Sequence, residues 1–172
     1  MKNLWSPWRS QYIESFFEQT ANKNCIFCEM FNQNIEDDKS LVVYKDDASL
    51  IALNLYPYNN GHLMIAPKKH TGDLLSLTKD DLRNIYEKIQ LAAKALNSVM
   101  KPHGFNIGAN IGKVAGAGID DHIHFHIVPR WNGDSNFMPV LGEVKVISQD
   151  LLTTKLNLKK EIKNILLNKN ES

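Results

Sequence analysis

The stretch His122-Ile123-His124-Phe125-His126-Ile127-Val128 decides how the rest of this chain can be arranged. It holds three of the protein's six histidines at alternate positions, and alternate residues of a β-strand share one face of the sheet. The apolar residues between them can then join a core on the other face. Pro129, which follows, has no N–H to donate to a neighbouring strand. The sequence therefore predicts a strand that carries a row of three imidazoles and ends near Pro129.

A loop of small residues, Ala115-Gly116-Ala117-Gly118, precedes the histidines. Imidazole titrates near neutral pH and can act as a nucleophile, acid, base or metal ligand. Glycine lets backbone N–H groups approach an anion closely, although these glycines could also serve only a tight turn. A nucleophilic ring beside an anion cradle favours phosphoryl or nucleotidyl transfer over a solvent-facing or metal-binding strand.

Length and composition describe an ordinary folded chain. With 172 residues, of which 43% are hydrophobic and 23% charged, the sequence is long enough for a core of its own, and residues 1–172 are expected to form a single domain. The net charge of +1 gives no reason to expect nucleic-acid binding. No apolar run reaches the roughly 18 residues that cross a bilayer, and residues 1–8 lack the apolar core of a signal peptide. We therefore expect a cytoplasmic protein without a membrane partner.

Hydrophobic patterning predicts further strands. Each is a short run rich in apolar and β-branched residues and bounded by turn-forming residues. These runs cover residues 41–44, 49–53, 61–66 and 105–112, with another candidate at 144–147. The first two lie close together in the sequence and are typical of a hairpin.

Two helices are expected. Thr78 and Asp81 have the spacing of a capping box, and apolar residues then recur every three or four positions to about Met100. Residues 148–172 should hold a C-terminal helix, over 151–167, and a frayed tail. Together with the strands, these helices indicate an α+β fold in which an antiparallel sheet of about five strands packs against helices.

Cys25 and Cys28 are the only cysteines of the chain. Their spacing leaves three interpretations open, a redox pair, half of a zinc site or two buried thiols. A redox motif of the thioredoxin kind would need a βαβ context, which the surrounding sequence does not predict. A zinc site would need two more histidine or cysteine ligands from elsewhere in the chain.

These features together resemble those of the histidine-triad (HIT) superfamily of nucleotide hydrolases and transferases. The triad stretch agrees with the superfamily's signature, and residues 54–70 are similar to its second motif. Residues 4–9 and 128–139 look most like the bacterial diadenosine tetraphosphate phosphorylase/hydrolase-like branch. The resemblance implies a HIT-like fold and a homodimer, which in this superfamily commonly forms through the long helix.

The resemblance also implies a role for each triad histidine. His124 would attack the α-phosphorus of an adenine mononucleotide or dinucleotide, such as diadenosine tetraphosphate, while a backbone carbonyl holds its other ring nitrogen. His126 would donate to the phosphate oxygens, and His122 would be a metal ligand or a hydrogen-bond partner. Water or inorganic phosphate would then release the nucleotide. His62 would lie behind the triad and support it.

A structural zinc is the cofactor that the resemblance implies, with no organic cofactor. Related proteins bind zinc through a Cys-x-x-Cys pair, a histidine after the second motif's strand and the first triad histidine. In this sequence these positions hold Cys25, Cys28, His70 and His122.

The substrate contacts that the resemblance implies include one departure. Asn54 would bind the ribose hydroxyls, although asparagine also commonly ends a strand. Asn110 would contact the α-phosphate. Residues 115–119 offer no side-chain hydroxyl or amide, so Lys113 or the backbone N–H groups of Gly116, Ala117 and Gly118 would have to hold the phosphate. Asp120 and Asp121 are expected to face away from it.

Other interpretations stay open at this point. The chain could be a non-catalytic nucleotide-binding module, a nucleoside phosphoramidate hydrolase of the same superfamily, or a protein with a metal site built on the histidine strand. Residues 1–24, with Trp5, Trp8 and Arg9, are expected to form an arm that packs on the body or completes the pocket.

Overall fold

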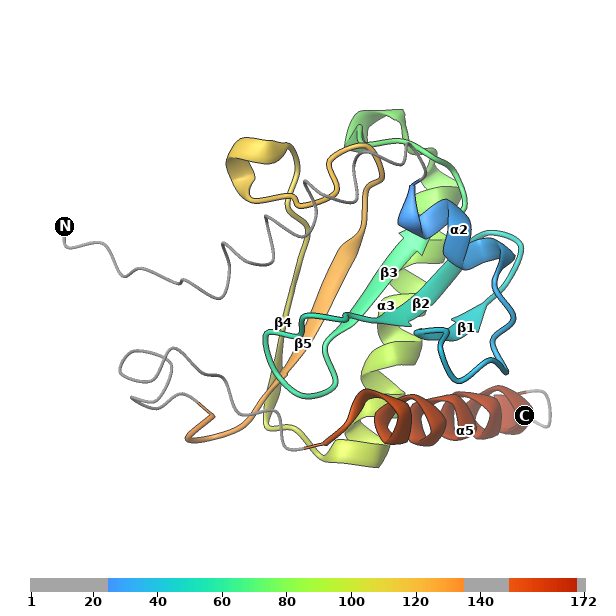
Figure 1. The fold of residues 1–172 in the computed structure, drawn as a ribbon, viewed down its shortest axis with the longest axis vertical. Coiled ribbons are helices and arrows are strands. Elements are labelled where there is room, and N and C mark those ends of the chain that lie inside the picture. Colours follow the sequence, from blue (N-terminus) through green and yellow to red (C-terminus); the bar gives the residue numbers. More distant parts are fainter. Residues whose placement is uncertain (1–24, 135–148, 170–172) are drawn as a thin grey trace, which may run out of the picture.

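The computed structural model of the chain describes residues 25–134 and 149–169. Its centre is a five-stranded antiparallel sheet with the strand order β1-β2-β3-β5-β4 (Figure 1). The strands are β1 (Val42–Lys45), β2 (Ser49–Leu53), β3 (Leu63–Pro67), β4 (Gly104–Gly108) and β5 (Phe125–Arg130). The predicted α+β class and the antiparallel sheet are confirmed.

Helices cover both faces of this sheet. The α-helices are α2 (Ile26–Asn32), α3 (Lys79–Met100) and α5 (Leu151–Lys169), and two short 3₁₀ turns are η1 (Leu74–Ser76) and η2 (Lys113–Ala115). The long helix α3 packs on β2, β3 and β5, and α5 packs on β1 and α3. Helix α2 lies on the opposite face, in front of β2 and β3 (Figure 1).

The central strands are buried on both sides because each face has its own hydrophobic cluster. Ile51 and Ile65 join the cluster beneath α3 and α5. Leu50 and Ala66 join a smaller cluster beneath α2, and Phe27 and Met30 of that helix belong to the same cluster. Side chains that alternate between the two faces therefore meet apolar partners in both directions.

The histidine strand begins later than the sequence predicts. Strand β5 starts at Phe125, so His122 and His124 precede it. Within β5, strand β3 pairs only with residues 125–127, and β4 ends at Gly108 opposite His126, so no strand of the described residues pairs with the segment before Phe125. Instead, the N–H of Ile123 donates to the carbonyl of Thr71 at 2.7 Å. The alternation is kept, because Ile123 and Ile127 are buried in the α3 cluster.

Strand β5 continues past Pro129 to Arg130. This is possible because β3 begins at Leu63, opposite Ile127, so none of the described strands faces Pro129 on that side. The Pro129 carbonyl instead accepts a hydrogen bond from the Asn59 side chain at 3.1 Å. The missing N–H of proline therefore costs no ladder hydrogen bond.

Other boundaries also differ from expectation. Strand β4 ends at Gly108 rather than at residue 112, and its last partner in β5 is His126, one residue after the start of that strand. Helix α5 extends to Lys169, two residues beyond the expected end. The capping box of α3, from Thr78 and Asp81, is confirmed. Neither α2 nor the two 3₁₀ turns were predicted. The expected arm over 1–24, the candidate strand at 144–147 and residues 170–172 lie outside the described residues.

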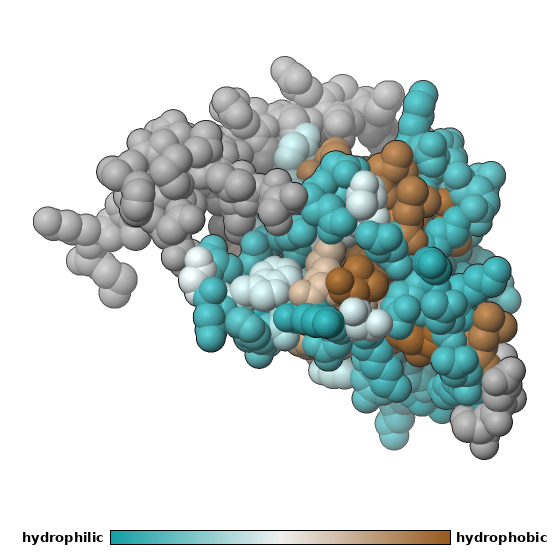
Figure 2. Space-filling model, turned by 90° about the horizontal axis from the view of Figure 1, so that it is seen from below, coloured by the Kyte–Doolittle hydropathy of each residue, from teal (hydrophilic) through white to brown (hydrophobic). Residues whose placement is uncertain are grey.

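An apolar groove of about 570 Å³ lies between β1 and α5, on the α3 and α5 side of the sheet. Figure 2 shows the α5 side of the molecule, where apolar side chains form patches between hydrophilic ones. The groove is lined by apolar residues, lysines, a tyrosine and one glutamate, without a histidine or cysteine, so the histidine chemistry lies elsewhere. Among the described residues, no helix is long and apolar enough to cross a membrane.

Gly72 is packed against the segment that leads into His122. A Cβ added there would lie 2.1 Å from the Asp120 carbonyl oxygen, so we expect Gly72→Ala to destabilise the fold by about 1–3 kcal/mol. Thermal unfolding followed by circular dichroism should show a midpoint lowered by several degrees. Gly104→Ala is the matched control, because an added Cβ there meets no atom within 4 Å. Equal midpoints for both variants would contradict the close approach.

Candidate functional site

The triad histidines lie on the sheet face that α2 covers. The ring centroid of Phe27, in α2, is 5.2 Å from that of His122 and 4.8 Å from that of His124. The rings of His124 and His126 meet edge to face, with centroids 4.9 Å apart. His122 and His124 are buried, and His126 is partly buried. The row of imidazoles therefore exists, although only its last member belongs to β5.

The hydrogen bonding of His124 defines which of its ring nitrogens carries the proton and which carries the lone pair. Its Nδ1 lies 3.0 Å from the carbonyl oxygen of His122. A carbonyl oxygen only accepts hydrogen bonds, so Nδ1 must carry the proton and Nε2 must carry the lone pair. Burial lowers the pKa of His124, so the ring is neutral at pH 7. Its Nε2 is thus available as a nucleophile.

His126 has the opposite tautomer, which His62 fixes. The backbone N–H of Tyr58 donates to His62 Nδ1 at 3.1 Å, so the proton of His62 is on Nε2. This Nε2–H donates to His126 Nδ1 at 3.0 Å, and the proton of His126 must therefore be on its own Nε2. Burial, followed by the nearby His124, lowers the pKa of His126 to about 4. The ring is neutral and keeps one N–H to donate.

Two neighbouring imidazoles thus offer complementary groups. His124 presents a lone pair, and His126 presents an N–H. A nucleophilic nitrogen beside a hydrogen-bond donor suits attack on an electrophile whose oxygens gain negative charge in the transition state. A phosphorus ester or anhydride is such an electrophile.

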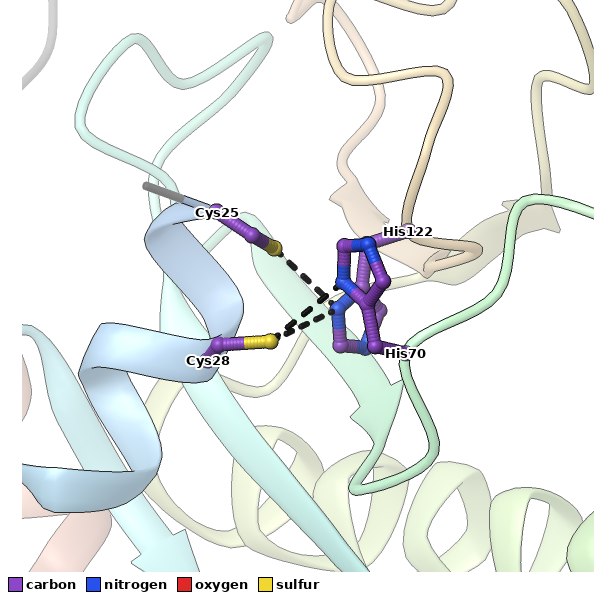
Figure 3. Close-up of side chains that lie close together, drawn as sticks. All are labelled: Cys25, Cys28, His70 and His122. Carbon is purple, nitrogen blue, oxygen red and sulfur yellow. Dashed lines mark hydrogen bonds between the residues drawn. The ribbon is translucent and has the colours of Figure 1, made fainter. Parts of the chain in front are cut away.

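The four residues expected to bind zinc lie together beside the triad (Figure 3). The donor atoms of Cys25, Cys28, His70 and His122 are all within 4.8 Å of one another. Nδ1 of His122 is 3.2 Å from Cys25 Sγ and 3.7 Å from Cys28 Sγ, and Nδ1 of His70 is 3.3 Å from Cys28 Sγ. Cys25 and Cys28 thereby form one cluster with two histidines that are far from them in the sequence.

The chemistry of this cluster fits a metal better than a redox pair. His122 Nε2 lies 2.8 Å from the Pro67 carbonyl oxygen, so Nε2 carries the proton and Nδ1 points its lone pair at the thiols. Such a hydrogen bond commonly orients a metal-binding histidine, and two sulfur with two nitrogen donors suit zinc. Burial raises the pKa of Cys25 to about 11, whereas a redox-active cysteine needs a lowered pKa.

A cavity of about 220 Å³ opens beside His124, between α2 and the end of β2. Asn54 lines it. The Asn54 side-chain oxygen accepts the N–H of Tyr56 at 2.9 Å, so the residue does form the turn that ends the strand. Its two possible roles are therefore compatible, because the turn uses the amide oxygen and the side chain still borders the cavity.

The small-residue loop differs from the expected phosphate cradle. Gly112 and Gly116 have positive φ angles of 80° and 89° and shape the turn around η2. The N–H of Gly116 donates to Lys113 O at 2.9 Å, and the N–H of Ala117 donates to Gly112 O at 3.3 Å. These two N–H groups are therefore used inside the turn and do not form an open cradle. Of the three proposed donors, this leaves Gly118.

Polar side chains around this loop are paired with one another. The Asn110 amide donates to Gly116 O at 3.4 Å, which is a long hydrogen bond at an exposed place. Asp120 lies 3.7 Å from the Lys113 ammonium, and Asp121 lies 3.9 Å from Nε2 of His70. Both carboxylates are thus oriented toward other partners than the rings of His124 and His126.

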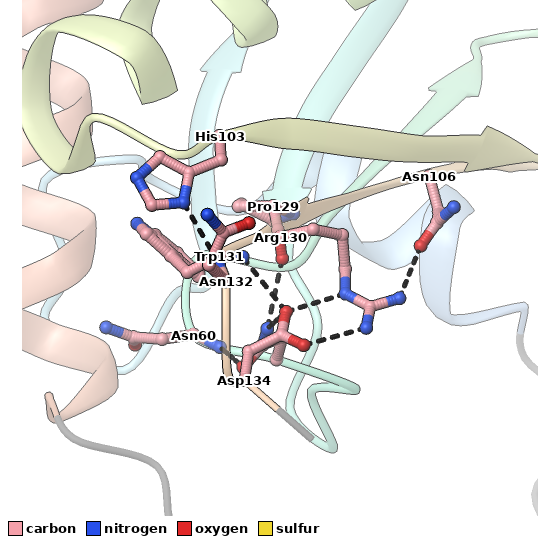
Figure 4. Close-up of polar contacts among 9 residues, drawn as sticks. Asn60, His103, Asn106, Pro129, Arg130, Trp131, Asn132 and Asp134 are labelled. Carbon is pink, nitrogen blue, oxygen red and sulfur yellow. Dashed lines mark hydrogen bonds and ion pairs between the residues drawn. The ribbon is translucent and has the colours of Figure 1, made fainter.

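A polar network at the far end of β5, which the sequence did not predict, supports the loop that carries Tyr58. Arg130 donates to both carboxylate oxygens of Asp134, at 2.6 and 2.8 Å, and to the Asn106 side chain at 2.7 Å (Figure 4). The Asn59 amide donates to the same Asp134 carboxylate at 2.9 Å. The residue after Tyr58 is therefore fixed to the end of β5.

Several groups of the site are backbone atoms. The Tyr58 N–H and the carbonyls of Pro67 and His122 set the three tautomers. A backbone carbonyl was expected beside His124, but the sequence could not say which one, and the groups beside His62 and His122 were not predicted, because no residue type marks a backbone group in a sequence. Tyr58 and Pro67 do lie within motif residues 54–70, and His122 lies within the histidine stretch.

Comparison with known proteins agrees with the resemblance to the HIT superfamily. The HIT domain family model matches residues 36–133. The AP-4-A phosphorylase of Mycobacterium tuberculosis is 37% identical over 158 residues, which cover 90% of this chain and 81% of that protein.

Two solved structures share the fold and have similar sequence identities to this chain. A hypothetical histidine triad nucleotide-binding protein from Sulfolobus tokodaii is 28% identical, with a TM-score of 0.66, over 82% of this chain and 93% of that one. A zinc-bound histidine triad family protein from Mycobacterium smegmatis is 26% identical, with a TM-score of 0.67, over 83% of this chain and 96% of that one.

The assigned tautomers can be measured directly. At pH 7, ¹⁵N NMR of the side chains should show Nδ1–H for His124 and Nε2–H for His126. His126 should stay neutral down to about pH 4. An unfolded histidine takes up its proton near pH 6.5, so between these values the unfolded chain binds more protons, and the free energy of unfolding should decrease as the pH falls. An Nδ1–H tautomer for His126, or its titration near pH 6.5, would contradict the assignment.

Proposed function

Since the chain belongs to the HIT domain family, we propose that it is an enzyme that transfers the nucleotidyl group of adenine dinucleotides such as diadenosine tetraphosphate. The observation that carries this proposal is the pair of opposite tautomers, His124 with a free Nε2 and His126 with a free Nε2–H. The similarity to a mycobacterial AP-4-A phosphorylase supports the substrate class.

In the first step, Nε2 of His124 attacks the α-phosphorus. A nitrogen–phosphorus bond forms while the bond from phosphorus to the bridging oxygen breaks, and the remaining nucleotide leaves with that electron pair. His126 donates its Nε2–H to an oxygen of the reacting phosphate and stabilises the developing charge. The hydrogen bond to the His122 carbonyl supports the positive charge that His124 acquires as it attacks.

In the second step, an acceptor oxygen attacks the same phosphorus and breaks the nitrogen–phosphorus bond, which regenerates His124. Two displacements replace one difficult displacement, as in other covalent mechanisms. Inorganic phosphate as the acceptor yields ADP, and water yields AMP. The relative's name supports phosphate, with water as the alternative acceptor.

The cavity beside His124 would hold the nucleoside. Asn54 borders it and would bind the ribose hydroxyls through its amide. The phosphate would lie between the triad and the small-residue loop, where the N–H of Gly118 and the side chains of Asn110 and Lys113 are the groups that could reach it. The N–H groups of Gly116 and Ala117 are excluded from this role, because they donate within the turn.

Cys25, Cys28, His70 and His122 would hold a zinc ion. It would stabilise the structure by joining α2 to the segment after β3 and to the start of the triad, because Cys25 and Cys28 lie at the beginning of α2, His70 follows β3 and His122 is the first triad histidine. The zinc-bound relative from Mycobacterium smegmatis supports this identity.

The expected homodimer is also a proposal. Strand β4 is an edge strand, and its backbone on one side has no strand partner in the described part of the chain. Ile107 of this strand is 50% exposed. An exposed edge strand offers another chain a site for pairing, in addition to the long helix α3, where the resemblance places the dimer contact. A monomeric mass in sedimentation would contradict the dimer. The cytoplasmic location and the single-domain organisation stay predictions from the sequence.

Turnover of diadenosine tetraphosphate, with products separated by ion exchange, tests the proposed function. Wild type should form ADP and ATP only when inorganic phosphate is present, and His124→Ala should lose at least about a hundredfold in rate. His103→Ala is the matched control, because His103 lies outside the site and should retain turnover. AMP and ATP without phosphate would make water the acceptor. Absence of both turnover and nucleotidyl labelling would overturn the enzyme proposal and favour a binding module.

A structural zinc makes a separate prediction. Wild type should contain about one zinc per chain, and Cys25→Ser should contain much less and unfold at a lower temperature, because metal binding contributes directly to folding. After treatment with a chelator, both proteins should unfold at similar temperatures. A zinc-free wild type, or a Cys25→Ser variant with unchanged zinc content and unfolding temperature, would contradict the proposal.

A further inference from the structure

One face of helix α2 forms a wall of the cavity beside His124. Its residues there are Ile26, Glu29, Met30 and Gln33, the last being the C-cap. They follow the helical spacing of i, i+3, i+4 and i+7, which places them on one face. Two are apolar and two are polar, and neither polar residue takes part in the chemistry described above. We propose that Glu29 and Gln33 read the edge of the bound base and select adenine, an inference that rests on the proposed nucleotidyl-transfer function.

The orientation of the Gln33 amide is set from outside the cavity. The hydroxyl of Ser40 donates to Gln33 Oε1 at 2.9 Å. Ser40 is only 4% exposed, and its oxygen accepts the N–H of Val42 at 3.3 Å. A buried hydroxyl proton needs an acceptor, so the amide oxygen of Gln33 is used here. The NH₂ group is left, and Gln33 therefore offers hydrogen-bond donors to a ligand.

Glu29 offers the complementary group. A carboxylate accepts hydrogen bonds and cannot donate them. Glu29 is exposed and lies four residues before Gln33, so the two side chains are neighbours on the helix surface. The mouth of the cavity thereby presents an acceptor beside a donor.

Adenine matches this pair. Its exocyclic amine is a donor that lies next to the ring nitrogen N7, an acceptor, so the amine would donate to Glu29 and N7 would accept from Gln33. At the same edge hypoxanthine has two acceptors, its oxygen and N7, and one of them would face the carboxylate, a repulsive contact.

The rest of the cavity lining also favours adenine over guanine. Apart from Glu29 and Gln33, most of the lining is apolar, including Leu53, Leu55 and Ile119, which suits the flat faces of a base. Guanine carries more polar edge groups than two side chains can satisfy, and each unsatisfied group is costly to bury. Adenine has fewer polar edge groups than guanine, because it lacks the second exocyclic amine, and the two hydrogen bonds of this wall leave fewer of them without a partner.

Titration calorimetry with nucleoside monophosphates tests this inference without turnover. Wild type should bind AMP roughly tenfold or more tightly than IMP or GMP. Glu29→Gln should reduce the preference for AMP over IMP to about twofold or less, because an amide can donate to the hypoxanthine oxygen as well as accept from an amine. Gln33→Leu should weaken AMP binding by roughly tenfold.

Deaza analogues identify the ring nitrogen that Gln33 contacts. We expect 7-deaza-AMP to bind wild type as weakly as AMP binds Gln33→Leu, and that variant should not distinguish 7-deaza-AMP from AMP, whereas 1-deaza-AMP should bind wild type as AMP does. Gln90→Leu is the matched control, since Gln90 is an exposed residue of α3 outside the cavity, and it should behave as wild type does.

The outcomes separate this inference from the proposed function. Nucleotidyl labelling of His124 with equal affinities for AMP, IMP and GMP would overturn base reading and leave the enzyme proposal intact. A preference for GMP, or an AMP preference unchanged in both the Glu29 and Gln33 variants, would likewise overturn it. Base discrimination that depends on these residues, in a protein without turnover, would support base reading while the enzyme proposal fails.

Discussion

The hydrogen bond between Nδ1 of His124 and the carbonyl oxygen of His122 is the constraint on which the rest of the site depends. It joins two residues of one extended segment, so its geometry is only as exact as the backbone there. That backbone is held from three directions. The N–H of Ile123 is bonded to Thr71, the Ile123 side chain is buried beneath α3, and the ring of His122 is bonded to Pro67.

His122 thereby connects two functions that could have been separate. Its carbonyl fixes the tautomer of His124, while its ring nitrogen points into the cluster with Cys25 and Cys28. The same helix that carries the two cysteines also forms the wall of the cavity beside His124. A metal in the cluster would therefore fix the cavity wall and the nucleophile relative to each other, without taking part in the reaction.

The second tautomer depends on a longer path. His126 is set by His62, His62 by the Tyr58 N–H, and the following residue, Asn59, by the carboxylate of Asp134 at the far end of β5. Each link is a hydrogen bond between partly or fully buried groups, where the lower dielectric strengthens polar contacts. A loop residue without a catalytic group of its own can thus control which nitrogen of His126 carries the proton.

The sequence by itself determined the class of fold and the alternating histidines, because residue type and spacing carry this information locally. The set of four clustered residues followed only from the resemblance to the HIT superfamily, since His70 and His122 are far from Cys25 and Cys28 in the sequence. The sequence misplaced the start of β5, since the pairing with β3 stops at Ile65 and Phe125 and β4 ends at Gly108, and neither limit can be read from the histidine stretch itself. It also could not show that the N–H groups of Gly116 and Ala117 are used within a turn. Only the tertiary structure decided the tautomers of His124 and His126, because the groups that set them are backbone atoms and a buried histidine brought together by folding.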